Sequence, residues 1–85
     1  GLYRADLSQS PIRFQEIPVP KATTGRTIYR VIQARSGRIW AAGEQGLLRW
    51  DEGSWTLFGA KDGLKFESLS YLAEDSAGAL WVGYT

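Results

Sequence analysis

Residues 74–85 read Glu74-Asp75-Ser76-Ala77-Gly78-Ala79-Leu80-Trp81-Val82-Gly83-Tyr84-Thr85. Sliding the sequence along itself by 41 residues places Gly37 on Gly78 and Trp40 on Trp81, so part of this motif occurs twice. The alternating apolar positions on either side of the tryptophans stay in register between the two copies. This period of two is typical of short, half-buried β-strands, and we interpret the chain as a repeat of such strands.

A second match has an offset of 45 residues. Residues 1–6 read Gly-Leu-Tyr-Arg-Ala-Asp and residues 46–51 read Gly-Leu-Leu-Arg-Trp-Asp, with identity at four of the six positions. The four additional residues fall within 7–12, where they predict a longer turn. Gly46 thus belongs to a repeated motif, and the sequence has no Gly-x-x-x-x-Gly-Lys pattern that would make it part of a phosphate-binding loop.

Each repeating unit is predicted to contain four strands bounded by Gly, Asp, Ser or Pro. The expected ranges are 27–34 and 68–74 for the first strand, 38–42 and 79–84 for the second, 2–5 and 47–50 for the third, and 12–17 and 54–58 for the fourth. The predicted fold is all-β, with antiparallel four-stranded units. Residues 1–24 form a half unit and a loop, residues 25–67 a complete unit, and residues 68–85 a second half unit.

The turns and the tryptophans have structural roles in this prediction. Gly37 and Gly78 supply the positive φ that the turn between the first two strands needs, and Asp75 accepts hydrogen bonds from its turn backbone. Asp51 is expected to act in the same way. Trp40 and Trp81 are expected to fill the space between neighbouring units, with a sugar-stacking platform as the alternative. Trp55 and Phe14, in the fourth strands, are expected to pack at the edge of a unit.

The composition excludes several classes of site. The chain has 85 residues, ten Lys+Arg against nine Asp+Glu, and no His, Cys or Met. Without His and Cys there is no ordinary zinc site, cysteine nucleophile or Ser-His-Asp relay. A net charge of +1 without a basic block argues against nucleic-acid binding. No apolar run approaches the roughly 18 residues of a membrane span. Because the sequence has neither an initial Met nor a charged and then apolar leader, we expect a processed protein or a piece of a longer chain, and we favour the piece.

The motifs resemble the two-component regulator propeller repeat, in which Asp-x-x-Gly, Leu-Trp-Val-Gly-Thr, Gly-Leu, an Arg-containing strand and Asp-Gly-Leu follow one another. Residues 74–85 resemble its first half, and residues 46–51 followed by Lys61-Asp62-Gly63-Leu64 resemble its second half. The central unit departs from the pattern at Ala34, where Asp is usual, and at residues 41–43, where Ala-Ala-Gly replaces Val-Gly-Thr. WD-type propellers are the nearest alternative, but they need a Gly-His pair and this chain has no His.

The resemblance implies a β-propeller fragment in which each four-stranded unit is a blade, taken from the periplasmic or extracytoplasmic sensor part of a bacterial two-component-type receptor. It implies a non-catalytic, ligand-sensing module without cofactor or metal. One alternative is a propeller that binds proteins or assembles with itself, without a small ligand. A glycan-active enzyme is a third, but it needs a pair of carboxylates across a cleft, and the sequence indicates no such pair.

A ligand is expected at one end of the strands. Loops that precede the first strand of a unit, and loops that join its second and third strands, should open on the same face, because the first and third strands run in the same direction. The polar residues placed there are Arg26, Glu44, Gln45, Asp62, Lys65 and Glu67. Ordinary solvated loop residues are the alternative interpretation for each of them.

The expected partners are other blades, either from the same parent chain or from copies of this chain joined head to tail. A small molecule or glycan is a further possible partner, and neither nucleic acid nor membrane insertion is expected for this segment. One unit with two half units leaves apolar faces and strand edges in water, so a stable monomer is not expected. A closed ring of three or four chains would contain six or eight blades.

Overall fold

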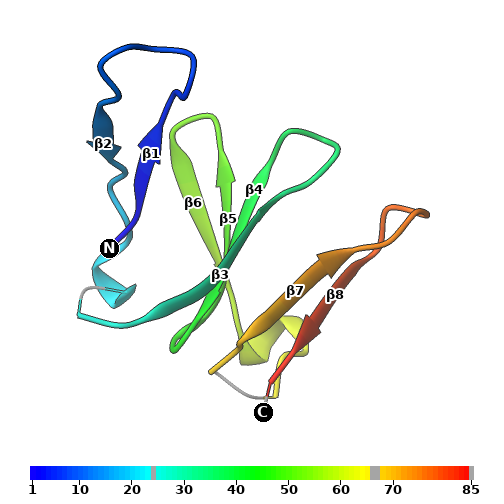
Figure 1. Ribbon diagram of the computed structural model, residues 1–85. Coiled ribbons are helices and arrows are strands. Elements are labelled where there is room, and N and C mark those ends of the chain that lie inside the picture. The colour runs from blue at the N-terminus through cyan, green and yellow to red at the C-terminus, as the bar shows by residue number, and fades with distance from the viewer. Residues whose placement is uncertain (24, 66–67, 85) are drawn as a thin grey trace.

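The computed structural model describes residues 1–23, 25–65 and 68–84, and these residues form an all-β fold (Figure 1). The strands are β1 (Tyr3–Ala5), β2 (Phe14–Glu16), β3 (Ile28–Gln33), β4 (Ile39–Gly43), β5 (Gly46–Asp51), β6 (Ser54–Phe58), β7 (Tyr71–Glu74) and β8 (Leu80–Gly83). Two single-turn 3-10 helices, η1 (Lys21–Thr23) and η2 (Ala60–Asp62), lie in the longer connections. The predicted all-β, antiparallel class is confirmed.

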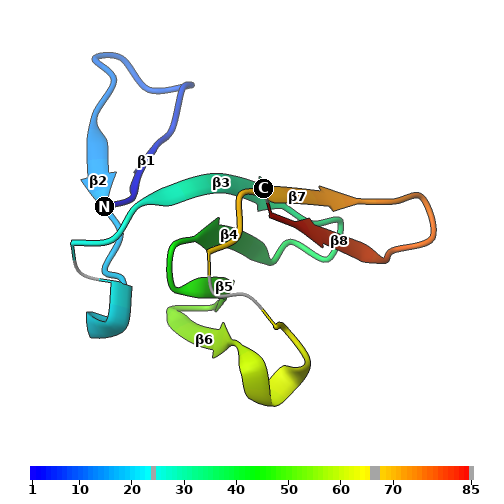
Figure 2. The same ribbon diagram turned by 90° about the horizontal axis from the view of Figure 1, so that it is seen from below.

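The strands form three antiparallel sheets: the hairpin β1–β2, the four-stranded sheet β3–β4–β5–β6 and the hairpin β7–β8. Within each sheet, neighbouring strands are also neighbours in the sequence. Figures 1 and 2 both show the four-stranded sheet between the two hairpins. Each strand overlaps a predicted range, but β7 begins at Tyr71 rather than at residue 68, so the connection from β6 is longer than expected.

The turns β3–β4 and β7–β8 are equivalent and are closed in different ways. Gly37 and Gly78 have φ values of 91° and 86°, which favour glycine. In the β7–β8 turn, Oδ1 of Asp75 accepts hydrogen bonds from the N–H groups of Ala77 and Ala79, each at 2.9 Å, as predicted. The β3–β4 turn has no carboxylate at the position equivalent to Asp75, because that position is occupied by Ala34.

The main core lies between the four-stranded sheet and the hairpin β7–β8. Its buried residues are Ala42, Leu47, Leu69 and Leu72, and Ile32, Trp40, Phe58, Leu64, Leu80 and Val82 pack against them. Alternate residues of β4 and β5 point toward this core, which is the arrangement that the period of two predicts. The hairpin β7–β8 is therefore held to the sheet by apolar packing, as Leu72 has no exposed surface.

Polar contacts join the same two parts at the turns. The backbone N–H of Arg35 donates to Oε1 of Glu74 at 2.9 Å, and Nη1 of Arg35 donates to the carbonyl of Ser76 at 2.9 Å. These bonds bring the β3–β4 turn to the β7–β8 turn.

The opposite face of the four-stranded sheet is covered by the hairpin β1–β2 and the chain after it. Trp50 and Trp55 contact each other there with ring centroids 5.0 Å apart and ring planes tilted by 57°, and Nε1 of Trp55 donates to the carbonyl of Pro18 at 2.6 Å. Between the hairpin and the sheet lies a hollow of about 240 Å³. Its lining residues are Leu2, Tyr3, Arg4, Ile17, Val31, Ile39, Trp50 and Trp55.

Candidate functional site

Two of the predicted ligand residues lie at the same end of the sheet: Arg26 where the chain enters β3, and Glu44 where β4 turns into β5. Oε1 of Glu44 accepts a hydrogen bond from the N–H of Thr27 at 2.6 Å, and the N–H of Glu44 donates to the carbonyl of Thr27 at 3.0 Å. The hydroxyl and N–H of Thr27, and then the charge of Arg26, lower the pKa of Glu44 below its usual range. An ionised carboxylate therefore lies at this end of the sheet, hydrogen-bonded to the residue that follows Arg26.

Gln45 lies beside this pair, in the β4–β5 turn. Its amide oxygen and nitrogen are both buried, and neither has a hydrogen-bond partner among residues 1–23, 25–65 and 68–84. The turn that holds it is joined to the segment before β7, because the carbonyl of Gly43 accepts a hydrogen bond from the N–H of Leu69 at 2.9 Å. The hydrogen-bonding capacity of the Gln45 amide is therefore not used by the part of the chain that the structure describes.

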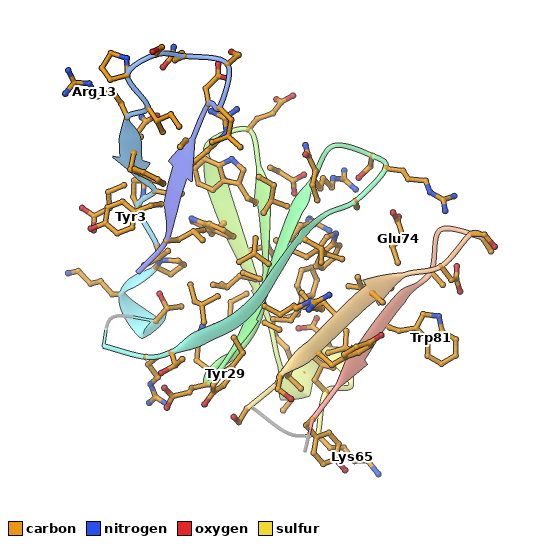
Figure 3. The ribbon with its side chains drawn as sticks, in the orientation of Figure 1. Tyr3, Arg13, Tyr29, Lys65, Glu74 and Trp81 are labelled. Atoms are coloured by element: carbon orange, nitrogen blue, oxygen red, sulfur yellow. The ribbon has the colours of Figure 1, made fainter. Side chains whose placement is uncertain are left out.

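The other predicted ligand residues lie in the connection from β6 to β7. Oδ2 of Asp62 accepts a hydrogen bond from the N–H of Gly59 at 3.0 Å, so this carboxylate closes the η2 turn. Lys65 lies against a separate hollow of about 270 Å³, near the end of β8, and Figure 3 shows its side chain directed outward. Glu67 lies outside the described residues. The geometry therefore groups Arg26, Glu44 and Gln45, while Asp62 and Lys65 belong to other parts of the connection.

Trp40 packs on the core side of the four-stranded sheet as part of a stack. Its ring centroid lies 5.7 Å from that of Phe58, and the guanidinium carbon of Arg49 lies 5.7 Å and 5.2 Å from the two ring centroids. A cation over the faces of two aromatic rings is attracted by both. Arg49 therefore covers the outer side of the Trp40–Phe58 pair.

Asp51 holds Arg49 in that position. Its Oδ2 accepts from Nε of Arg49 and its Oδ1 accepts from Nε of Arg38, both at 2.6 Å. Partial burial disfavours the charged form, but the hydrogen bonds from Arg49 and then Arg38 outweigh it and lower the pKa of Asp51. The expected turn role of Asp51 is corrected: its carboxylate binds Arg49 of its own strand and Arg38, which directly precedes the neighbouring strand β4.

Trp81 occupies the position equivalent to Trp40 but has different surroundings. Its side chain is 63% exposed, and its Nε1 donates to Oδ2 of Asp75 at 2.9 Å. Figure 3 shows the ring pointing away from the four-stranded sheet. The expectation that it fills a space between units is thus not met within this chain. The expected packing of Phe14 is also corrected, because its side chain is 71% exposed, whereas Trp55 is half-buried against Trp50.

Gly46 stands opposite Gly43 in the β4–β5 ladder with a φ of 126°, and it is buried. A glycine begins both copies of the motif. At Gly46 it lies in the tight connection between β4 and β5, where a side chain would strain the backbone.

Sequence reasoning missed the Arg38–Asp51–Arg49 cluster. A signal was present, because Arg4 and Asp6 recur as Arg49 and Asp51 at the offset of 45 residues. In the first copy Asp6 has other partners: its Oδ1 accepts from the N–H and hydroxyl of Ser8, at 3.0 Å and 2.6 Å.

Comparisons with protein-family models and with curated proteins found no match for this chain. Among the described residues, no group of three or more His, Cys, Asp or Glu side chains is arranged to hold a metal ion. Within the same residues, no helix has the length and hydropathy needed to cross a membrane.

Proposed function

We propose that the chain is a segment of a β-propeller of the two-component regulator type. In this assignment β3–β6 form one complete blade, β1–β2 are the last two strands of the preceding blade, and β7–β8 are the first two strands of the following blade. The segment acts as a non-catalytic binding module in the extracytoplasmic sensor part of a bacterial signalling receptor.

The observation that carries this proposal is that equivalent residues make both interfaces of the four-stranded sheet. Val31 and Ile39 face the hairpin β1–β2, across the 240 Å³ hollow. Leu72 and Leu80, which stand 41 residues later, face the four-stranded sheet in the main core. One rotation between successive units would account for both contacts, and repeated rotation of four-stranded sheets is the architecture of a propeller.

The loop end around Arg26, Glu44 and Gln45 is the proposed binding site. It offers an exposed cation and an ionised carboxylate, which can donate and accept hydrogen bonds, whereas the amide of Gln45 is buried and is not presented to a ligand. A hydroxyl-rich ligand such as a glycan, or a small polar molecule, matches such a mixture. We assign no acid–base catalysis to Asp51, Asp62 or Asp75. Each of these carboxylates already binds other groups of the chain.

A thermal-shift experiment with a panel of neutral and acidic oligosaccharides tests the binding function. A ligand that binds only the folded state raises Tm with concentration. We expect at least one oligosaccharide to raise the Tm of the native sequence and of Arg13→Ala, but not of Arg26→Ala. Arg13 is a suitable control because it is an exposed arginine in the distant β1–β2 connection (Figure 3). No shift with any sugar, or an equal shift in Arg26→Ala, would contradict the proposed site.

A further inference from the structure

The outer strands of the two hairpins each have an unpaired edge. Among the described residues, β8 pairs only with β7, and β1 pairs only with β2. The repeat makes β8 the equivalent of β4 and β1 the equivalent of β5. Because β4 and β5 pair with each other inside the chain, β8 and β1 have the sequences of two strands that fit together. Both edges also carry backbone N–H and C=O groups that a further strand can bind.

The internal ladder gives the register of such a pairing. In β4–β5, Ile39 pairs with Trp50, Trp40 with Arg49, and Ala41 with Leu48. Applying the offsets of 41 and 45 residues turns these pairs into Leu80 with Ala5, Trp81 with Arg4, and Val82 with Tyr3. The pairing is antiparallel, and it continues the order of the complete sheet.

The surroundings of Trp40 have a counterpart beside Arg4. Trp40 packs with a set of residues from both sheets, and Arg49 lies over its ring. The equivalents of five members of this set line the 240 Å³ hollow. The equivalent pairs are Leu47 and Leu2, Arg49 and Arg4, Phe58 and Ile17, Leu72 and Val31, and Leu80 and Ile39. The hollow is therefore an apolar site of the kind that Trp40 occupies, and it lies next to an arginine.

We propose that, in a solution of the 85-residue chain by itself, this site and the β1 edge bind the hairpin β7–β8 of a second copy of the chain. Strand β8 of one copy pairs with β1 of the next, and Trp81 of the first copy enters the hollow beside Arg4 of the second. The result is a four-stranded sheet β7–β8–β1–β2 that reproduces β3–β4–β5–β6. This inference rests on the blade assignment of the proposed function but not on ligand binding.

Exposed aromatic residues favour this occupant over an unrelated protein. Trp81 is 63% exposed on β8, and Tyr3 and Phe14 are 61% and 71% exposed on β1–β2. Head-to-tail pairing places Trp81 against the Arg4 side of the hairpin, and it places Tyr3 and Phe14 against the sheet that precedes it. Large aromatic side chains contribute most to stable interfaces when they are buried. A second copy accounts for all three with residues already present in the sequence.

The contact is heterologous, so repetition either closes a ring or continues as a fibre. Each added copy brings one complete four-stranded sheet and completes a second one with the hairpin of its neighbour. A ring of three or four copies would have six or eight blades.

Size-exclusion chromatography with light scattering on the full 85-residue chain tests the proposal, with far-UV circular dichroism to establish folding. We expect a β-rich species of three or four times the 9.5 kDa chain mass. Trp81→Ser should lower the measured mass three- or fourfold at the same protein concentration. Tyr29→Ser is the matched control, because Tyr29 is an aromatic residue on a strand with 51% exposure, outside the proposed contact (Figure 3).

Cysteine cross-linking tests the register even if Trp81→Ser fails to fold. The sequence has no Cys, so each introduced thiol is unique. A mixture of Tyr3→Cys and Val82→Cys chains should form a mixed disulfide under mild oxidation, because directly opposed residues on paired strands are close enough to bridge. A mixture of Tyr3→Cys and Tyr71→Cys, with the second thiol one strand further away, should form at least tenfold less.

Three outcomes would overturn the proposal: a folded, monodisperse monomer, an unfolded chain, or equal cross-linking in the two mixtures. A folded monomer that still binds an oligosaccharide at Arg26 would leave the proposed binding function standing without the assembly. An assembled ring that binds none of the sugars would support the assembly and contradict the proposed binding function.

Discussion

The indole nitrogen of Trp81 donates a hydrogen bond to Oδ2 of Asp75 at 2.9 Å, while Oδ1 of the same carboxylate accepts from two N–H groups of the β7–β8 turn. One side chain therefore fixes both the turn and the orientation of an exposed ring. The chain uses this carboxylate to present Trp81 on the outer face of β8, before any partner is bound.

The charge of Asp75 should stabilise the fold in a pH-dependent way. The bond from Trp81, followed by the bond from the N–H of Ala79, lowers the pKa of Asp75 below its ordinary value of 3.8. Because the folded-state pKa is the lower one, the stabilisation is fully present above the unfolded-state value. It is lost as the pH falls below about 4 and through the folded-state pKa.

Urea denaturation between pH 2 and pH 6 measures this effect. Asp6, Glu44 and Asp51 also have lowered pKa values, so the informative quantity is the difference in the free energy of unfolding between the native chain and Asp75→Asn. This difference should shrink as the pH falls below 4. The indole N–H resonance of Trp81 should shift over the same range. A difference that is constant with pH would contradict the role of the charge.

Gly43→Ala should destabilise the fold by about 1–3 kcal/mol, because added atoms in tight packing force the backbone to shift. A Cβ at Gly43 would lie 2.5 Å from the carbonyl oxygen of Thr27. Gly83→Ala is the milder comparison, since its Cβ would meet Cβ of Tyr71 at 3.3 Å, a contact that a shift of a few tenths of an ångström relieves. Urea denaturation should give a clearly larger loss at Gly43. Equal losses at the two glycines would show that the contact with Thr27 is unimportant.

Arg49→Lys should lower the free energy of unfolding by about 1 kcal/mol, because lysine lacks the planar group that covers two rings while binding a carboxylate. The matched variant is Arg38→Lys, which changes the other arginine bound to Asp51. The Arg38 side chain is 53% exposed against 27% for Arg49, so its substitution should change stability by less than about 0.5 kcal/mol. If the two variants lose the same stability, the contact of Arg49 with Trp40 and Phe58 is not the stabilising one.

Gln45→Met should raise the free energy of unfolding by about 1 kcal/mol, since it removes a buried amide that has no partner among the described residues. Gln33→Met serves as the control, because the exposed Gln33 amide already donates to the carbonyl of Gly37 at 3.3 Å. This control should be neutral or slightly destabilising. A loss of stability in Gln45→Met would contradict this account of the buried amide.

The strands and turns could be predicted because they depend on local patterns. Alternating apolar residues identify β3–β8, and Gly37, Gly78 and Asp75 mark the turns by their conformational preferences and hydrogen bonds. The packing of Leu72 and Leu80 against the sheet also agrees with the period of two. The proposed grouping of Arg26 with Glu44 could be predicted from strand direction alone.

Other features depend on contacts that the local sequence does not encode. Trp40 and Trp81 occupy equivalent positions of the repeat but differ in burial. Within the described residues, a strand pair packs against the side of the sheet that carries Trp40, and none packs against the side that carries Trp81. The partners of Asp51 are Arg49, two residues away on the same strand, and Arg38, 13 residues earlier in the turn before β4. The burial of the Gln45 amide and the extra length of the β6–β7 connection are likewise set by packing.

In residues 1–23, 25–65 and 68–84, every strand ladder joins segments that follow one another directly along the chain, and strands β3 and β4 of the four-stranded sheet contact β7 of the next hairpin. During synthesis, each hairpin can therefore form as soon as its second strand has left the ribosome, without waiting for a distant segment. Tandem duplication of the 41- to 45-residue period lengthens such an array while leaving the existing pairings untouched. The connectivity of these sheets makes gene duplication a direct route to a larger protein.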